Sequence, residues 1–300
     1  MERHAGHGWR VRAMRRLTGG VETSTHEVTL DRAADDRLLR LVLRRPHQWA
    51  IEQNPDAVAQ QAAVLAHVAH NAPDLPAPEV LAHDATGLLM QRLPGRIDVV
   101  PRDMGSWLQQ QADALRVIHG IPPIPAAPRA VAAVDISAKK PPEWSVHPEL
   151  WEQALATIAA GHPDPDRADR ELTFVHGDFQ HFNLLWSRGR LTGIVDWSSY
   201  KARHPSKDVG HCRLNLVILY GSEVADDLAR RYGAPVDPWW DLFETCIFLP
   251  SWGDTIVRQV GTRLGVPVDV DAIHRRVDAH LPNLLDRVEV SRPSLDRPRS

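Results

Sequence analysis

The chain has 300 residues, of which 43% are hydrophobic and 24% are charged, and its formal net charge at pH 7 is −3. This composition is typical of a globular protein, and the length suits two domains or one two-lobed unit. The small net charge argues neither for nor against a nucleic-acid partner. The two cysteines, Cys212 and Cys246, provide neither a disulfide framework nor a zinc-binding spacing, which suits a reducing cytosol.

The sequence contains no run of about eighteen apolar residues, the length that a membrane-spanning helix requires. The basic N-terminal segment MERHAGHGWRVRAMRR lacks the apolar region of a secretory signal. We therefore expect a cytoplasmic protein without a membrane partner, and we expect no nucleic-acid partner either.

The first part of the chain reads as strands and one helix. Residues 26–30 and 38–45 are aliphatic runs separated by polar turn residues, which predicts a hairpin. Apolar residues at helical spacing predict a helix over 57–71. Residues 87–95 read as a strand that ends at a Pro-Gly pair, and we place the end of an N-terminal lobe, residues 1–94, there.

The remainder is mostly helical and forms a predicted C-terminal lobe over residues 95–292. A proline-rich segment at 121–143 interrupts it and predicts an irregular excursion. The tail at 293–300 is predicted to be disordered. Amphipathic spacing and helix-start or helix-stop residues predict four helices, over residues 104–120, 148–161, 222–233 and 237–254.

Two segments of the larger lobe carry polar side chains between hydrophobic flanks. They are FVHGDFQHFNLLW at residues 174–186 and LTGIVDW at residues 191–197. A buried carboxylate is costly unless it is paired or binds a metal, so Asp178 and Asp196 require a common explanation.

The residues that follow Asn183 and those that precede Asp196 read as two strands joined by the turn SRGR. Such a hairpin places Asn183 and Asp196 side by side. Amide and carboxylate oxygens suit Mg²⁺, which takes phosphate oxygens as further ligands. Asp178 starts the preceding loop and is placed to accept a proton from an attacking hydroxyl, so the pattern predicts phosphoryl transfer.

These motifs closely resemble those of the aminoglycoside phosphotransferase and choline kinase-like family, which has the two-lobed, α+β protein-kinase-like fold with a small β-rich N-lobe and a larger helical C-lobe. The resemblance rests on HGD-x4-N followed by VDW and covers most of the chain. Further matching segments are LTGGVETST, LVLRRP, GLLMQRLPG, ALRVIHG and KDVGH.

The resemblance implies a role for each matching polar residue. Asp178 would be the catalytic base, and Asn183 and Asp196 would be the Mg²⁺ ligands. His176 would brace the catalytic loop, and Asp208, in KDVGH, would anchor that loop from the start of a helix.

The resemblance also implies a nucleotide site in the N-terminal lobe for ATP or GTP. Gly19 and Gly20 would cover the phosphates. The hinge at residues 90–93 would contact adenine through backbone groups, with Gln91 and Leu93 as its binding residues.

The sequence departs from the kinase pattern at the phosphates, because the N-terminal lobe contains no lysine. Strand alternation puts Val42 and Arg44 on one face, so Val42 would line the adenine pocket and Arg44 would reach the phosphates, with Arg45 as the alternative. Gln61 stands where a helix glutamate is expected and would hydrogen-bond the guanidinium, and Glu52 is a second candidate for that partner.

The predicted function is ATP-dependent transfer of the γ-phosphoryl group to a hydroxyl of a small molecule, an aminoglycoside-like antibiotic or related metabolite, which would make the protein an antibiotic-resistance enzyme. Carboxylates would suit a polycationic acceptor, and Asp241, Glu244 and Asp254 are the candidates. Tryptophans around 239–252 would instead allow cation–π contacts with choline, and a sugar or homoserine stays open.

Two alternatives come from other classes. Arg44 and Gln61 would also suit a nucleotide-binding pseudokinase or regulator with little turnover. The pair His176 and His181 near carboxylates would suit a zinc hydrolase, although zinc sites usually draw on a larger ligand set.

Overall fold

The computed structural model describes residues 8–17, 23–32, 34, 37–124, 136, 139–163, 171–256, 260–261 and 264–291, with side chains except at 248–256. The chain forms two compact units. Unit 1 comprises Met1–Asp98 and Asn183–Ser199, and unit 2 comprises Val99–Phe182 and Tyr200–Ser300. The functional lobe limits of 1–94 and 95–292 stay predictions, and the predicted tail at 293–300 lies outside the described residues.

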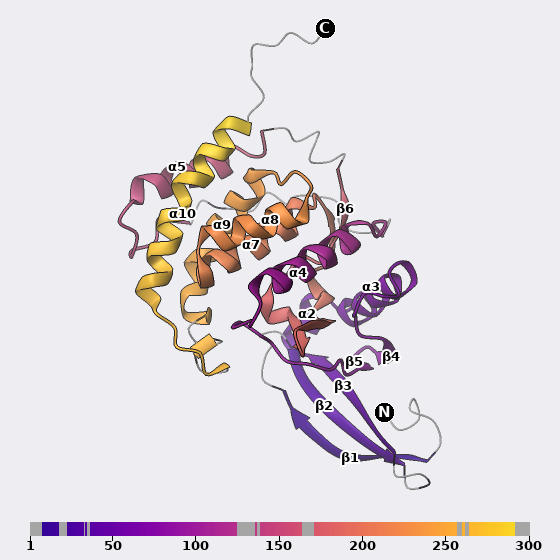
Figure 1. Ribbon diagram of the computed structural model, residues 1–300. Coiled ribbons are helices and arrows are strands. Elements are labelled where there is room, and N and C mark those ends of the chain that lie inside the picture. Colours follow the sequence, from indigo (N-terminus) through magenta and orange to yellow (C-terminus); the bar gives the residue numbers. More distant parts are fainter. Residues whose placement is uncertain are drawn as a thin grey trace. The chain divides into compact units, whose positions relative to one another are not determined.

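Unit 1 is built on a five-stranded antiparallel sheet with the order β1-β2-β3-β5-β4 (Figure 1). The predicted hairpin is confirmed as the β2–β3 pair, whose register aligns Val28 with Leu41. The strands are β1 (Trp9–Arg16), β2 (Thr23–Arg32), β3 (Arg37–Pro46), β4 (Val80–Asp84) and β5 (Gly87–Gln91).

One apolar face of this sheet forms the core of unit 1. Val28, Leu30, Leu41 and Leu89 are almost fully buried there and pack together. Two helices follow β3, namely α2 (Gln48–Gln53) and α3 (Ala57–Asn71), and α3 has the limits that its apolar spacing predicts.

A second, smaller hairpin belongs to unit 1 although it comes much later in the sequence. Its strands are β7 (Leu184–Ser187) and β8 (Arg190–Ile194). Arg188 and Gly189 in its turn both have positive φ, 52° and 75°, as a two-residue hairpin loop requires. Two backbone hydrogen bonds join Trp186 to Arg96 in the first half of the unit, at N···O distances of 3.0 and 2.7 Å.

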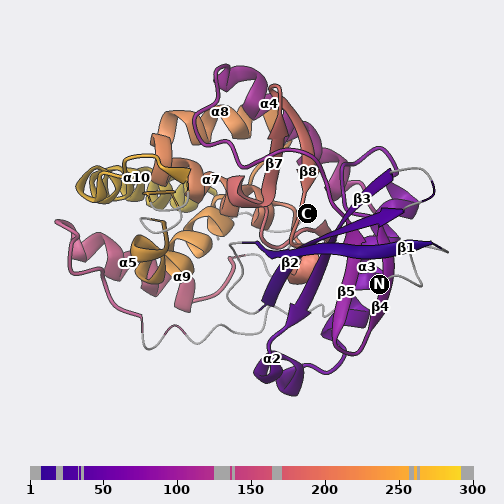
Figure 2. The ribbon, with the colours of Figure 1, turned by 90° about the horizontal axis from the view of Figure 1, so that it is seen from below.

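Unit 2 is mainly helical, and α7 runs through its middle with α8 and α9 alongside (Figures 1 and 2). Two short strands pair within it, β6 (Thr173–Val175) and β9 (Lys201–Arg203). The helices are α4 (Met104–His119), α5 (Pro148–Ala159), α7 (Ser206–Tyr220), α8 (Ser222–Tyr232), α9 (Pro238–Ile256) and α10 (Val270–Ser291).

Helix α7 is buried on all sides from Ser206 to Ile218. It therefore lacks the apolar stripe that reveals a surface helix in a sequence. Gly210 lets α9 approach closely, because a Cβ at this position would lie 3.1 Å from the Asp241 nitrogen. This close approach brings polar side chains of α7 and α9 into contact.

The four helices predicted in this part of the chain are present, with ends that differ by one or two residues. The N-cap position of α8 is Gly221. The hydroxyl of Ser222, the first residue of the helix, hydrogen-bonds His280 Nδ1 at 2.9 Å. Gly233 ends α8 in the left-handed conformation, as its position predicts. In the part of the chain that the structure describes, no helix is both long and apolar enough to span a membrane.

Candidate active site

The β7–β8 hairpin brings two predicted metal ligands to the same end of unit 1. Leu184 pairs with Ile194, and beyond this pair the Val195 N–H donates to the Asn183 carbonyl at 2.9 Å. Asn183 and Asp196 therefore flank the last rung of the hairpin. Asp196 has φ 66°, a left-handed conformation that is uncommon for a residue other than glycine and is concentrated at functional sites.

Arg44 of β3 reaches this end of the hairpin within unit 1. Its Nη2 lies 2.7 Å from Asp196 Oδ1, which also accepts a 2.6 Å hydrogen bond from Ser198. The Arg44 Nε donates to Thr23 at 3.2 Å. Among the described residues Arg44 makes no hydrogen bond with Gln61, so the partner of this arginine is the hairpin carboxylate.

The donor set at the hairpin end suits a magnesium ion. An amide and a carboxylate supply two oxygen ligands, and Mg²⁺ commonly takes its other ligands from water and phosphate. No group of three or more His, Cys, Asp or Glu side chains within the described ranges could hold a metal by itself. The residues thus fit an ion that arrives with a phosphate ligand, and the zinc alternative gains no support.

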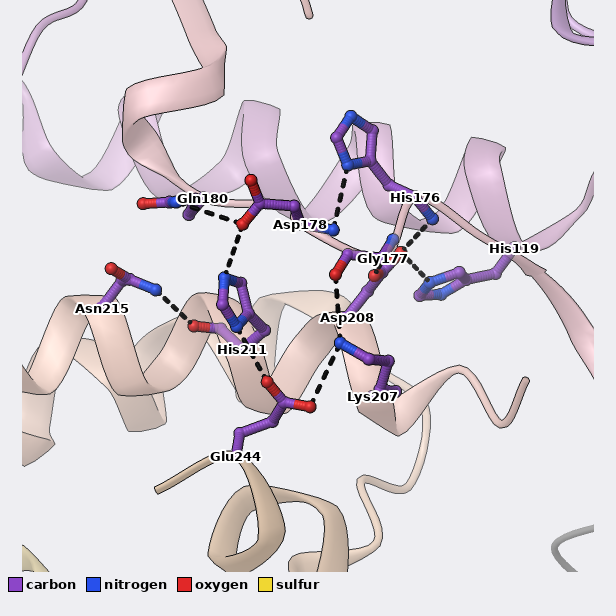
Figure 3. Close-up of polar contacts among 10 residues, drawn as sticks. All are labelled: His119, His176, Gly177, Asp178, Gln180, Lys207, Asp208, His211, Asn215 and Glu244. Atoms are coloured by element: carbon purple, nitrogen blue, oxygen red, sulfur yellow. Dashed lines mark hydrogen bonds and ion pairs between the residues drawn. The ribbon is translucent and has the colours of Figure 1, made fainter. Parts of the chain in front are cut away.

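In unit 2 the loop between β6 and η1 (His181–Asn183) holds Asp178, and Asp208 of α7 fixes the start of this loop. The Asp208 carboxylate accepts the His176 N–H at 2.6 Å and the Gly177 N–H at 2.8 Å (Figure 3). His176 Nδ1 in turn accepts the Asp178 N–H at 3.2 Å. Gly177 has φ 86°, so the loop turns sharply immediately before Asp178.

Asp208 is ionised in this setting. Burial alone would raise its pKa, but the hydrogen bond from His119 and the charges of His119, His176 and Lys207 outweigh burial and lower the pKa. A charged carboxylate is a strong acceptor for backbone N–H groups, which stabilises the loop conformation.

Asp178 itself receives two side-chain hydrogen bonds on Oδ1. His211 Nε2 lies 2.9 Å away and Gln180 Nε2 lies 3.1 Å away (Figure 3). The Asp178 side chain is 29% exposed, so solvent or a ligand has access to it. A carboxylate that is oriented by hydrogen bonds on one oxygen and is partly exposed can accept a proton from a hydroxyl.

The other ring nitrogen of His211 contacts the buried ion pair of Glu244 and Lys207. His211 Nδ1 is 2.8 Å from Glu244 Oε2, and Glu244 Oε1 is 3.1 Å from Lys207 Nζ (Figure 3). Burial would raise the pKa of Glu244, yet the charge of Lys207 and the hydrogen bond from His211 lower it. Glu244 is therefore a buried carboxylate that is ionised and paired on both oxygens.

Comparison with known proteins places this arrangement in a family. A sequence profile described as the phosphotransferase enzyme family matches residues 13–243. The chain belongs to the phosphotransferase enzyme family. A comparison with curated protein sequences gives no significant match.

Solved structures show the same fold at low sequence identity. A thermostable mutant of aminoglycoside phosphotransferase APH(4)-Ia in its apo form has a TM-score of 0.57 and 20% identity, covering 94% of this chain and 99% of that one. A macrolide 2'-phosphotransferase type I has a TM-score of 0.51 and 18% identity, covering 92% of this chain and 93% of that one. The ADP-bound aminoglycoside phosphotransferase APH(2'')-Ib has a TM-score of 0.50 and 13% identity, covering 93% of this chain and 95% of that one. The predictions of a kinase-like fold and of a small-molecule phosphotransferase are confirmed.

The other predicted nucleotide contacts of this phosphotransferase lie in or near the sheet of unit 1. Val42 is on β3, paired with Met90 of β5. The Gln91 N–H already donates to the Glu79 carbonyl at 2.8 Å, and the Leu93 side chain packs near Gly193. Gly19 and Gly20 lie outside the described residues. The nucleotide roles of these residues stay predictions.

The three predicted acceptor contacts occupy different settings. Glu244 and Asp241 are buried, and Asp241 Oδ2 is 2.7 Å from Arg213 Nε. The side chain of Asp254 lies outside the described set. Acceptor binding stays a prediction for all three, but the interior pairing gives Asp241 and Glu244 structural partners that the sequence did not reveal.

Sequence reasoning missed His211 and Lys207, which contact the Asp178 loop and its support. Lys207 Nζ donates to the Gly177 carbonyl at 3.1 Å, while His211 contacts Asp178 directly. The available signal was the concentration of polar residues in KDVGH, which forms the first part of α7.

Proposed function

We propose that this phosphotransferase moves the γ-phosphoryl group of ATP, or of GTP, to a hydroxyl of a small molecule. The observation that carries the proposal is the setting of Asp178, a partly exposed carboxylate whose Oδ1 is held by His211 and Gln180. This is the arrangement that a base for an alcohol requires, because its orientation is set before the substrate binds.

The reaction needs little covalent chemistry from the protein. A lone pair of the acceptor oxygen forms the new bond to the γ-phosphorus, and the bond from that phosphorus to the β,γ-bridging oxygen breaks, releasing the nucleoside diphosphate. Asp178 accepts the hydroxyl proton and passes it to solvent. Asn183 and Asp196 would hold Mg²⁺, which when bound neutralises phosphate charge.

Arg44 supplies the positive charge that the usual lysine would bring. The Arg44 side chain is 12% exposed, and its Nη2 lies 2.7 Å from Asp196 Oδ1. A guanidinium can bind two phosphate oxygens at once while keeping a contact to a neighbouring carboxylate, so Arg44 would link the nucleotide to the hairpin.

An aminoglycoside-like antibiotic or a related hydroxylated metabolite is the proposed acceptor class. One structure of APH(4)-Ia, which shares the fold at 18% identity, contains AMP-PNP and hygromycin B, and another neighbour is a macrolide phosphotransferase. These neighbours support a nucleotide and an antibiotic as the two substrates, and with them a role in antibiotic resistance.

The test is a panel of aminoglycosides, macrolides and hydroxylated metabolites, incubated with ATP or GTP and Mg²⁺ and analysed for a mass increase of one phosphoryl group. Asp178→Ala should lower kcat by about 10²–10⁴ while nucleotide still binds. Asp196→Ala should weaken binding of the magnesium–nucleotide complex. Nucleotide binding without phosphorylation of any acceptor would favour the pseudokinase reading instead.

A further inference from the structure

His211 of α7 bridges two carboxylates that belong to different elements. Its Nε2 lies 2.9 Å from Asp178 Oδ1, and its Nδ1 lies 2.8 Å from Glu244 Oε2 (Figure 3). A neutral imidazole has one N–H and can donate to only one carboxylate, whereas the imidazolium donates to both. The two distances therefore favour the protonated ring.

The charges around His211 balance only when its ring is an imidazolium. Glu244 is fully buried and is shared between His211 and Lys207. Lys207 also donates to the Gly177 carbonyl next to Asp178. The contacts therefore run from Asp178 to His211 of α7, on to Glu244 of α9, and back to the catalytic loop through Lys207 of α7. Two cations then face two carboxylates, and a buried charge without a partner would be costly.

The remaining neighbours support the same state. Burial alone would lower the pKa of His211, but the hydrogen bonds and charges of Asp178 and Glu244 raise it to about 9. His181 of η1 also interacts electrostatically with His211 and Asp178. Lys201 and Arg203 of β9 interact electrostatically with Glu244.

We propose that His211, held as an imidazolium by Glu244, is a positioning residue for phosphoryl transfer that fixes the direction of the Asp178 carboxylate. This inference rests on the proposed role of Asp178 as base. An imidazole ring clamped at both nitrogens has no freedom to rotate, and Asp178 Oδ1 is thereby fixed. Small displacements of a reacting group can reduce a rate about a hundredfold, which makes such a clamp important for turnover.

Two substitutions separate the two hydrogen bonds. In His211→Gln the amide nitrogen takes the place of Nε2 and can still donate to Asp178. In His211→Asn the shorter amide takes the place of Nδ1 and can donate only toward Glu244. The matched control is Asn215→Leu, one turn along α7, which removes a buried amide that donates to the His211 carbonyl at 2.9 Å.

The proposal predicts that His211→Asn lowers kcat by about 10–100-fold while KM for the nucleotide changes by less than about threefold. His211→Gln should retain a large part of the wild-type kcat, and the kcat of the control Asn215→Leu should stay near the wild-type value. The wild-type rate should fall as pH rises through about 9, where the imidazolium is lost, and this alkaline decline should be absent in His211→Gln.

A double-mutant cycle with Asp178→Asn tests whether His211 acts through the base. If it does, His211→Asn adds almost no further loss in the Asp178→Asn background. A full additional loss in that background, or a wild-type kcat in folded His211→Asn, would overturn the proposal.

Nuclear magnetic resonance of the histidine rings provides a readout that does not depend on turnover. Nitrogen-15 shifts should show His211 protonated at both nitrogens at pH 7.5 in the wild type and deprotonated in Glu244→Gln. A neutral His211 in the wild type would overturn the clamp. A protonated His211 in a protein that phosphorylates no acceptor would instead refute the proposed function and leave the clamp intact.

Discussion

Asp208 offers the sharpest test of how the catalytic loop is held. The substitution Asp208→Ala removes the acceptor of two backbone N–H groups, on the buried His176 and the half-buried Gly177. Leaving one buried donor without a partner costs about 1–3 kcal/mol, so the two together should cost about 2–6 kcal/mol. Asp208→Asn keeps one acceptor oxygen and should lose about half of that stability.

Urea denaturation followed by circular dichroism measures this loss as a lower midpoint at unchanged slope. Asp227→Ala is the control, because it removes half-exposed ion pairs with Arg230 and Arg231 on α8 and should cost less than about 1 kcal/mol. An Asp208→Ala protein as stable as this control would refute the anchoring role.

The pH dependence gives an independent check on the same group. The folded-state pKa of Asp208 is lowered from its ordinary value of 3.8, so its contribution to stability is present above pH 3.8 and is lost as pH falls below that value. The difference in unfolding free energy between wild type and Asp208→Ala should therefore shrink in acid.

Three further predictions concern other parts of the chain. The pKa of His211 is raised to about 9, so its contribution to stability is complete below pH 6.5 and is lost as pH rises through about 9, which urea titrations at pH 6 and pH 10 would reveal. Gly95→Ala should destabilise the protein by about 2–5 kcal/mol, because φ is 108° and the new Cβ would lie 2.6 Å from Thr192 Oγ1. Gly161→Ala is the control for this substitution. It has φ 83° but open space around the new Cβ, so urea titration should show a loss of only about 1–2 kcal/mol. Burial raises the pKa of both Cys212 and Cys246, so a thiol reagent should label them only as fast as the protein unfolds, and rapid labelling of native protein would contradict this.

Much of the fold is readable from local sequence. The spacing of apolar residues locates α3 with its observed limits, and the turn SRGR locates the β7–β8 hairpin. The hairpin then explains why Asn183 and Asp196 reach the same end of unit 1, although twelve residues lie between them in the sequence. Local patterns suffice here because neighbouring segments pair with each other.

The parts that the sequence does not reveal depend on contacts between distant segments. Helix α7 has no apolar stripe because all of its sides are covered, so periodicity cannot identify it. Glu244 resembles a residue on a solvated or acceptor-binding face until α9 packs against α7 and buries it beside His211. Arg44 pairs with Asp196, a contact between segments far apart in the sequence that the hairpin brings together.

The central claim is that Asp178 acts on the acceptor hydroxyl during phosphoryl transfer. The most direct measurement is single-turnover transfer of labelled phosphate from ATP to an identified acceptor by wild type and Asp178→Asn, with ATP affinity measured in parallel. The account predicts a transfer rate lower by about 10²–10⁴ at nearly unchanged ATP affinity. Transfer by Asp178→Asn at the wild-type rate would contradict it.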